Sequence, residues 1–583
     1  MDTSRIRDGL DKLGVKRLLL AIHDTSFPSD PDEDIGRGSP ATKAAARLFG
    51  YARELGFTGI QLGPQGQTSR DNPSPYDGTI FSRHLGNIAV ASLRAGGPFA
   101  GLVDDGVIDR CLVSDGGRAQ HVHAFEASHA LVAAAHSALE RGARPDLRAK
   151  LSDYARSQAH WLLSDALHSA VCWERNAGFR AWPERDRELW ITNDLDRIRE
   201  LVGEHERAID RYALGQLLVH EEHLRIRATC GLKLYGDMQV GYSDADAWRF
   251  ADVFLPGYLM GAPPSRTNPE GQPWGYPVLD PAGYAGPARA LVVARAEKAF
   301  AEYDSLRIDH PHGLVCPWVY RTGSGNDAQA VRDGARLFES PDLADHPALA
   351  MFAIARADQI QRDKPRHHDD WVKGLDDDQI ARYAILVDAI VDAAERNGRS
   401  RADLSCEVLS TMPTPLACVL QRHGLGRWRV TQKANLDDPT DVYRTEHVAR
   451  EDWLMLGNHD TPPIFAVIRD WSPAQRERWC RHLAARLALA HPERLASARY
   501  LASAMLAELF VSRAENVSIF FADLFGITER FNVPGLVDAA NWSLRLPHDF
   551  EVLHASQLDR EHALDLSLAI ELALSASHVT LAR

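Results

Sequence analysis

The 583-residue sequence lacks long hydrophobic runs and has few cysteines. An apolar run near the start, Leu18 to Ile22, is far too short to cross a membrane. The first residues, Met1 to Arg5, lack the basic and apolar regions of a signal peptide. The seven cysteines are odd in number and include no Cys-x-x-Cys pair, which argues against a disulfide framework or a zinc site. These absences predict a cytoplasmic protein with reduced thiols.

The chain also lacks an excess of positive charge, because its formal net charge is −14 and its sequence pI is near 6.0. Such a protein is repelled at long range by nucleic acids and by anionic membranes, so neither is expected as a partner. A neutral substrate is compatible with this charge. With 45% hydrophobic residues and no internal repeat or low-complexity linker, the chain can bury a large core.

Eight short apolar runs, rich in Leu, Ile and Val, alternate with helical patterns. The runs are 17–22, 58–62, 232–236, 305–309, 403–407, 427–431, 453–457 and 517–521. Continuous apolar runs of this length are typical of parallel strands buried on both faces. Helices are expected over 41–55 and 380–397, with Gly56 and Gly398 just past their ends. The alternation predicts an α/β fold, a (β/α)8 TIM barrel.

Two intervals are too long for simple crossovers between strands. Residues 95–225 have a mainly helical pattern, with amphipathic runs at 127–141 and 155–171, and are expected to form an insertion beside the barrel mouth. Residues 320–400 are expected to form the second insertion. Its charged stretch at 366–370 is interpreted as a solvated loop in preference to a metal site. The expected organisation is one catalytic barrel over 1–583 that carries both insertions.

Three carboxylates stand where apolar runs end. Asp309 lies two residues after Arg307 and next to His310, and a strand would place Asp309 and Arg307 on the same side. Taken alone, this pair is equally well explained as a surface ion pair. Glu407 and Asp460 close two further runs. Because strand ends converge on one face of a parallel barrel, the three acids suggest a retaining glycosidase, which needs a nucleophile and a proton donor about 5 Å apart.

Short motifs follow these strand ends in a fixed order. They are Gln61-Leu62-Gly63-Pro64-Gln65-Gly66, Ser74-Pro75-Tyr76, Gly236-Asp237-Met238, Asp244-Ala245-Asp246-Ala247-Trp248, Gly271-Gln272-Pro273-Trp274-Gly275-Tyr276-Pro277 and Asn532-Val533-Pro534-Gly535. Over nearly the whole chain, this order resembles glycoside hydrolase family 77, the 4-alpha-glucanotransferases. The resemblance implies transfer of α-1,4-glucan segments to a glucose or maltooligosaccharide acceptor through a covalent glycosyl-enzyme intermediate, without a cofactor or metal ion.

The resemblance also implies a role for each matching residue. Asp309 would be the nucleophile, Glu407 the acid/base, and Asp460 the third catalytic acid, which grips the sugar together with His459. The other substrate-binding residues would be Tyr76, Asp237, Gln272, Trp274, Arg307 and His310, with Tyr76 as a platform under the sugar at the cleavage point and Trp274 on a Gly-rich loop at the acceptor side.

The chain departs from the family pattern at several of these motifs. Where the family reads Ala-Glu-Asp-Leu-Gly, this chain has Cys406-Glu407-Val408-Leu409-Ser410, so the acidic neighbour of Glu407 is lost. The family's Thr-His-Asp-Asn reads Asn458-His459-Asp460-Thr461, and Asp77 replaces the Gln that follows the platform Tyr. A proton donor that acts in both steps is expected to have a raised pKa, so we predict a raised pKa for Glu407.

Two other functional classes remain open. The first is an α-amylase-type hydrolase of α-1,4-glucans, which the acceptor-side segment around Trp274 disfavours. The second is a non-catalytic α-glucan-binding relative, which retention of all three acids disfavours. For Gln272 an ordinary loop amide is equally plausible, and His121, His123 and His129 read as ordinary residues of the helical insertion.

Overall fold

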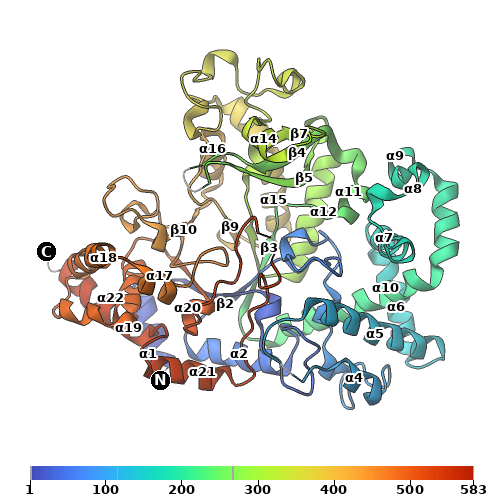
Figure 1. Ribbon diagram of the computed structural model, residues 1–583, viewed down its shortest axis with the longest axis horizontal. Helices are drawn as coiled ribbons and strands as arrows, with labels where there is room; N and C mark the ends of the chain where they lie inside the picture. The colour runs from blue at the N-terminus through green and yellow to red at the C-terminus, as the bar shows by residue number, and fades with distance from the viewer. Residues whose placement is uncertain (1–2, 115, 266–267, 537, 582–583) are drawn as a thin grey trace.

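A sheet of eight parallel strands forms the centre of the computed structural model, which describes residues 3–114, 116–265, 268–536 and 538–581 (Figure 1). Met1 and Asp2 of the terminal segment considered above lie outside these residues. Around the sheet the order is β10 (Trp428–Val430), β11 (Trp453–Met455), β12 (Asn516–Phe520), β1 (Arg17–Ile22), β2 (Gly59–Leu62), β3 (Lys233–Met238), β6 (Ser305–Ile308) and β9 (Leu404–Cys406). A parallel bridge between Cys406 and Arg427 joins the two edge strands, so the sheet closes into the predicted barrel.

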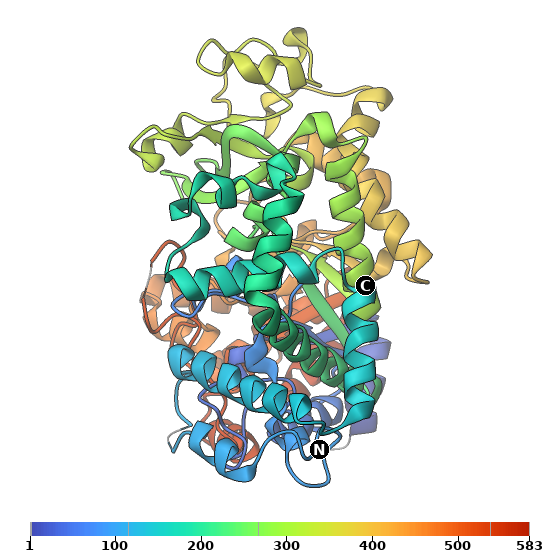
Figure 2. The ribbon, with the colours of Figure 1, turned by 90° about the vertical axis from the view of Figure 1, so that its right-hand side faces the viewer.

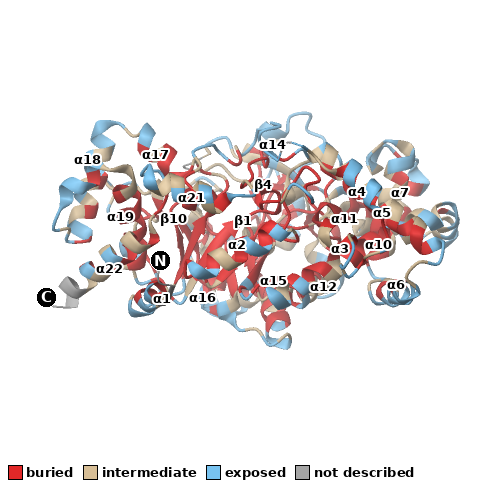
Figure 3. Cartoon of the chain, turned by 90° about the horizontal axis from the view of Figure 1, so that it is seen from below, coloured by how far each residue is buried: buried red, intermediate tan, exposed pale blue. Residues whose placement is uncertain are grey.

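Each of the eight predicted apolar runs overlaps one of these strands, with bounds that differ by at most two residues. The reason is burial on both faces, since β2, β6 and β12 are buried at every position. Side chains inside the barrel cover one face and helices cover the other, so the strands need no polar alternation. Figure 3 shows these buried strands between helices whose outer faces are exposed.

Helices surround the barrel between its strands. They are α1 (Thr3–Lys12), α2 (Lys43–Glu54), α12 (Pro287–Glu302), α15 (Asp377–Arg396), α16 (Thr414–His423), α17 (Ile464–Asp470), α18 (Pro473–Arg486), α19 (Ala498–Phe510), α21 (Phe550–Asp559) and α22 (Leu566–Leu581). The predicted helix ends are confirmed, because Gly56 and Gly398 have φ of 82° and 69° just beyond α2 and α15. Glycine adopts this left-handed conformation without the steric cost that other residues meet. Among the described residues, no helix has the length and apolar character that a membrane span requires.

A group of helices, much of it within the first interval expected to be an insertion, packs against one side of the barrel (Figure 2). It comprises α4 (Asp105–Cys111), α5 (His121–Glu140), α6 (Pro145–Ser157), α7 (Leu162–Arg175), α8 (Glu184–Arg187), α9 (Leu189–Thr192), α10 (Leu195–Thr229) and α11 (Asp244–Arg249). The amphipathic run at 155–171 is divided between two helices, because the chain turns between α6 and α7. At this turn the fully buried Trp161 donates its indole N–H to Gln158 and stacks on Phe81.

A second, antiparallel sheet was not predicted from the sequence. Its order is β5 (Gln272–Leu279), β4 (Phe254–Ala262), β7 (Trp318–Arg321) and β8 (Ala335–Arg336). The acceptor-side segment is therefore a hairpin, and Trp274 lies in a strand where a loop was expected. Glycines and prolines in β5 interrupt the alternation of apolar and polar residues by which a strand is recognised in a sequence. The β4–β5 pairing also shifts register twice.

A buried ion pair fastens the helical group to the barrel. Arg83 Nη2 lies 2.9 Å from Glu302 Oε2, at the end of α12, and both side chains are almost fully buried. Lys298 also pairs with Glu302, and the side chain of Gln216 in α10 hydrogen-bonds both the N–H and the C=O of Arg83. Burial alone would raise the pKa of Glu302, but the charges of Arg83 and Lys298 hold it well below its usual range.

We expect Glu302→Gln to lower the free energy of unfolding by about 3–5 kcal/mol, because two buried cations lose their counter-ion. Urea unfolding of the purified protein measures this change. The control is Glu126→Gln, which breaks an exposed pair with Arg70 and should cost less than about 1 kcal/mol. Equal losses in the two variants would contradict a structural role for the buried pair.

Candidate active site

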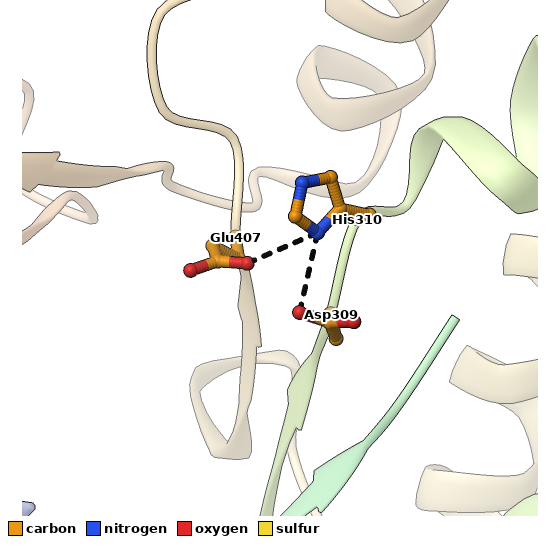
Figure 4. Close-up of side chains that lie close together, drawn as sticks. All are labelled: Asp309, His310 and Glu407. Carbon is orange, nitrogen blue, oxygen red and sulfur yellow. Dashed lines mark hydrogen bonds and ion pairs between the residues drawn. The ribbon is translucent and has the colours of Figure 1, made fainter. Parts of the chain in front are cut away.

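Two carboxylates face each other at the carboxyl ends of neighbouring strands. Asp309 follows β6 and Glu407 follows β9, and the backbone N–H of Glu407 still donates to Ile308, at 2.9 Å. Oxygen atoms of the two side chains lie within 4.8 Å of each other (Figure 4). Both residues are 5% exposed. The barrel therefore holds the two predicted acids as one buried pair.

The buried guanidinium of Arg307 binds three carboxylates at once. Its Nη1 lies 2.6 Å and 2.5 Å from the two oxygens of Asp237, and its Nη2 lies 3.3 Å from Asp309 and 2.6 Å from Glu407. Burial opposes the charged form of Arg307, but Asp237 and Glu407 raise its pKa well above the usual value. Burial and the neighbouring acids raise the pKa of Asp237 to about 7, despite the opposing effect of Arg307.

His310 bridges the two facing acids. Its Nδ1 lies 3.3 Å from Asp309 Oδ1 and 3.2 Å from Glu407 Oε2. The backbone adopts φ of 41°, an uncommon value for a residue with a side chain, and this turns the ring toward the acids. Burial would lower the pKa of His310, but Asp309 and Glu407 raise it to about 10. His310 is therefore an imidazolium at neutral pH.

The predicted raised pKa of Glu407 is wrong for this site. Burial does favour the protonated form, but Arg307 first and His310 second outweigh it and hold the pKa of Glu407 well below its usual range. The sequence argument was based on the two roles of Glu407 in the reaction and did not include the charges of Arg307 and His310. The proton that an acid catalyst needs is held on His310, 3.2 Å from Glu407.

Two aromatic residues frame this charged centre. The hydroxyl of Tyr76 donates to Asp237 at 3.3 Å, and its ring stacks on His459 with 5.3 Å between centroids. On the other side, the ring of Trp274 stands edge-on to His310 at 5.1 Å. The structure therefore brings Tyr76 and Trp274 beside the acids, from segments far apart in the sequence.

The two remaining predicted residues lie farther along the contact network. Asp460 Oδ2 is 3.5 Å from His459 Nε2, and Asp460 Oδ1 accepts a 2.6 Å hydrogen bond from Asn532. Its side chain is 36% exposed, so it can meet a ligand at the edge of the site. Gln272, at the start of β5, lies beside Gly535 of the C-terminal loop. Sugar contacts by Asp460 and Gln272 stay predictions.

The sequence reading missed His23, which comes directly after β1. Its buried ring packs edge-on against His459, with 4.9 Å between centroids, and at a tilt against Trp542, with 5.5 Å between centroids. Together with Arg307, Glu407 and His459, it lines a small cavity at the bottom of the site. Its position could have indicated a role, because polar residues just after a strand point into the barrel mouth. The sequence analysis used this criterion only for carboxylates.

Two departures from the family pattern have partners in the structure. Asp77 accepts a 2.6 Å hydrogen bond from the hydroxyl of Tyr276 in β5, which ties the loop of Tyr76 to the hairpin. Asn458 and Thr461 bond within their own turn, since Thr461 Oγ1 accepts from the backbone N–H of Asn458 and Asn458 Oδ1 from that of Asp460. Both changes keep the backbone of the site supported.

Asp309, His310 and Glu407 also have a spacing that could hold a metal ion. Arg307 contacts both carboxylates and His310 is protonated, so the positive charge is already supplied by the protein. A further cation would be repelled at these distances. The arrangement is better suited to proton transfer and nucleophilic attack.

Comparison with known sequences identifies relatives of one kind. The sequence model of the family described as 4-alpha-glucanotransferase matches residues 22–550. A chloroplastic/amyloplastic 4-alpha-glucanotransferase of Oryza sativa subsp. japonica is 27% identical over 322 residues, which are 52% of this chain and 52% of that protein. A 4-alpha-glucanotransferase of Mycobacterium bovis is 32% identical over 154 residues, 24% of this chain and 20% of that protein. The chain thus aligns with about half, or less, of these relatives' length.

Solved structures share the fold. The amylomaltase from Streptococcus agalactiae in complex with acarbose superposes with a TM-score of 0.73 at 16% identity, covering 96% of this chain and 99% of that one. Amylomaltase from Corynebacterium glutamicum gives 0.64 at 17% identity, covering 98% and 76% of the two chains. At such identities the likeness establishes the architecture.

The raised pKa of His310 leads to a prediction about pH. If activity needs one proton on the cluster, kcat/KM falls as pH rises through the pKa of the group that holds it. His310→Asn leaves the proton to carboxyl groups of lower pKa, so the alkaline limb should move down by at least about one pH unit. pH profiles with a maltooligosaccharide measure this shift. His312→Asn is the control, because burial lowers the pKa of His312 to about 3, and an unmoved limb in His310→Asn would contradict the assignment.

Proposed function

We propose that this chain, which belongs to the 4-alpha-glucanotransferase family, is a retaining enzyme that transfers α-1,4-glucan segments between maltooligosaccharides. The observation that carries the proposal is the 4.8 Å limit on the distance between oxygens of Asp309 and Glu407. Retaining glycosidases hold their two carboxyl groups about 5 Å apart, whereas inverting enzymes leave roughly 6.5–9.5 Å for a water molecule. The spacing supports a covalent intermediate on Asp309.

In the first step, Asp309 attacks the anomeric carbon of the donor sugar. The backbone N–H of Val240 donates to its Oδ2 at 3.1 Å, and Nη2 of Arg307 lies 3.3 Å from its Oδ1. As the new bond forms, the glycosidic carbon–oxygen bond breaks and its electron pair goes to the leaving oxygen. The imidazolium of His310 passes its proton to the adjacent Glu407, and Glu407 delivers this proton to the leaving oxygen and becomes a carboxylate again.

In the second step, a hydroxyl of the acceptor glucan attacks the same carbon. Glu407, again a carboxylate, removes the proton of this hydroxyl, and the bond to Asp309 breaks. Tyr76, His459 and Asp460 line the side on which the transferred sugar would remain between the two steps. The sugar then leaves with its original anomeric configuration.

The hairpin of β4 and β5 favours transfer over hydrolysis. It places Trp274 edge-on to His310, where a flat apolar ring can hold the C–H face of an acceptor glucose. A bound acceptor competes with water for the intermediate. We also propose that the barrel and its two insertions, 95–225 and 320–400, act as one catalytic unit.

We also propose α-1,4-glucans, such as starch or glycogen fragments, as substrates and the cytoplasm as location. Neutral oligosaccharides fit a site whose charges compensate one another. All seven cysteines lie within the described residues and are free thiols, which fits a reducing compartment.

Incubation with maltotriose tests the function. Longer and shorter oligomers without a rise in reducing ends are expected, whereas a steady rise would mean hydrolysis and no change would mean binding alone. Asp309→Asn should lower turnover on the order of 1,000-fold or more, because it removes the nucleophilic charge while keeping the size. Asp109→Asn, at an exposed carboxylate of α4, is the matched control. Near-normal turnover in Asp309→Asn would contradict the mechanism.

Trp274→Ala should raise the ratio of hydrolysis to transfer several-fold, because a loosely held acceptor competes less well with water. Reducing ends and oligomer products, measured on the same maltooligosaccharide sample, give this ratio. Trp173→Ala is the control, since Trp173 is 67% exposed on α7 of the helical group. An unchanged ratio with a lower melting temperature would show that Trp274 only stabilises the hairpin.

A further inference from the structure

His23 carries two hydrogen-bonding groups that the protein leaves unused. The residue is 5% exposed, and within the described part of the chain neither Nδ1 nor Nε2 has a hydrogen-bond partner. Leaving one buried polar atom unpaired is already costly, so two on one ring require an explanation. An ordinary core position would have been filled by an apolar side chain of similar shape.

The surrounding residues hold the ring in one place. Directly after β2, Gly63 lies against it, and a Cβ there would come 2.2 Å from Cδ2 and 2.7 Å from Nε2 of His23. On other sides the ring meets His459, Phe531 and Trp542. A glycine is therefore needed at position 63 for the imidazole to occupy this position.

The space next to the ring belongs to the catalytic centre. The cavity that His23 lines together with Arg307, Glu407 and His459 has room for about one water-sized group. A sugar hydroxyl is such a group. A second cavity that His23 also lines runs along the loop that carries Pro75, next to Tyr76. The ring thus lies close both to the catalytic acid Glu407 and to Tyr76, whose ring centroid is 6.3 Å away.

The protonation state of His23 suits a hydroxyl partner. Burial lowers its pKa well below the usual value, and the nearby charges of His459 and Arg307 act in the same direction. A neutral imidazole has one donor and one acceptor nitrogen. A sugar hydroxyl can likewise donate and accept, so it can satisfy either ring nitrogen, whereas a bound anion could pair only with the donor.

We propose that His23 binds substrate in the transferase reaction, by hydrogen-bonding one hydroxyl of the sugar unit held between Asp309 and Glu407. The inference rests on the proposed function and adds a residue to it. Because the ring nitrogens have no hydrogen-bond partner among the described residues, a hydroxyl of the sugar can supply one. Its contribution is therefore realised only when the sugar lies in the site.

The test combines variants of His23 with altered donors. His23→Phe keeps an aromatic ring in the cluster and removes both nitrogens, and kcat/KM with an α-maltosyl fluoride donor should fall roughly 10- to 100-fold. Donors that lack the 2-, 3- or 6-hydroxyl of the reacting sugar are then compared in both proteins. At one of these positions, loss of the hydroxyl should lower kcat/KM of the wild type but should not lower kcat/KM of His23→Phe any further.

Gly63→Ala is the second variant, because it displaces the ring without removing it, and it should show the same loss at the same hydroxyl. It also answers the question if His23→Phe does not fold. Equal losses on every deoxy donor in variant and wild type would overturn the assignment, as would an unchanged kcat/KM in both variants. A wild type without turnover of any fluoride donor would instead contradict the proposed function, and the role of His23 with it.

Discussion

The contact of Arg307 with three carboxylates is the interaction on which the site depends. The side chains of Asp237, Asp309 and Glu407 are all buried, and the guanidinium of Arg307 is a positive charge in contact with all three. The barrel supplies the geometry, because Asp237 lies directly opposite Arg307 in the β3–β6 pairing. Removing Arg307 would therefore break its contacts with three acids and take away the charge that holds the pKa of Glu407 low.

The sequence predicted the barrel well because its strands are defined by burial. A strand covered on both faces is a continuous apolar run, and such runs can be read without knowing their neighbours. The second sheet could not be found in this way. Its strands pair irregularly and contain glycine and proline, so β5 was read as a loop and Trp274 was placed on it. Only the three-dimensional pairing with β4 makes this segment a strand.

In the site as well, features formed by neighbours in the sequence could be predicted, and features that depend on three-dimensional packing could not. Arg307, Asp309 and His310 are neighbours in the chain, so their grouping was visible in the sequence, and Glu407 could be added from its place at a strand end. The pKa of Glu407 was predicted in the wrong direction, because Arg307 and His310 reach it across the β6–β9 pairing, about a hundred residues away. His23 was missed since its unpaired nitrogens are a property of packing.

Two histidines at the barrel mouth show how packing assigns opposite states to one residue type. His310 lies between two carboxylates that favour its charged form, so it can hold a proton within 3.2 Å of Glu407. Burial and nearby positive charge make His23 neutral. In the proposed reaction, His310 can supply the proton that Glu407 gives to the leaving group and take a proton back after the second step. His23 does not compete for that proton, so it can bind a hydroxyl without disturbing the acid–base cycle.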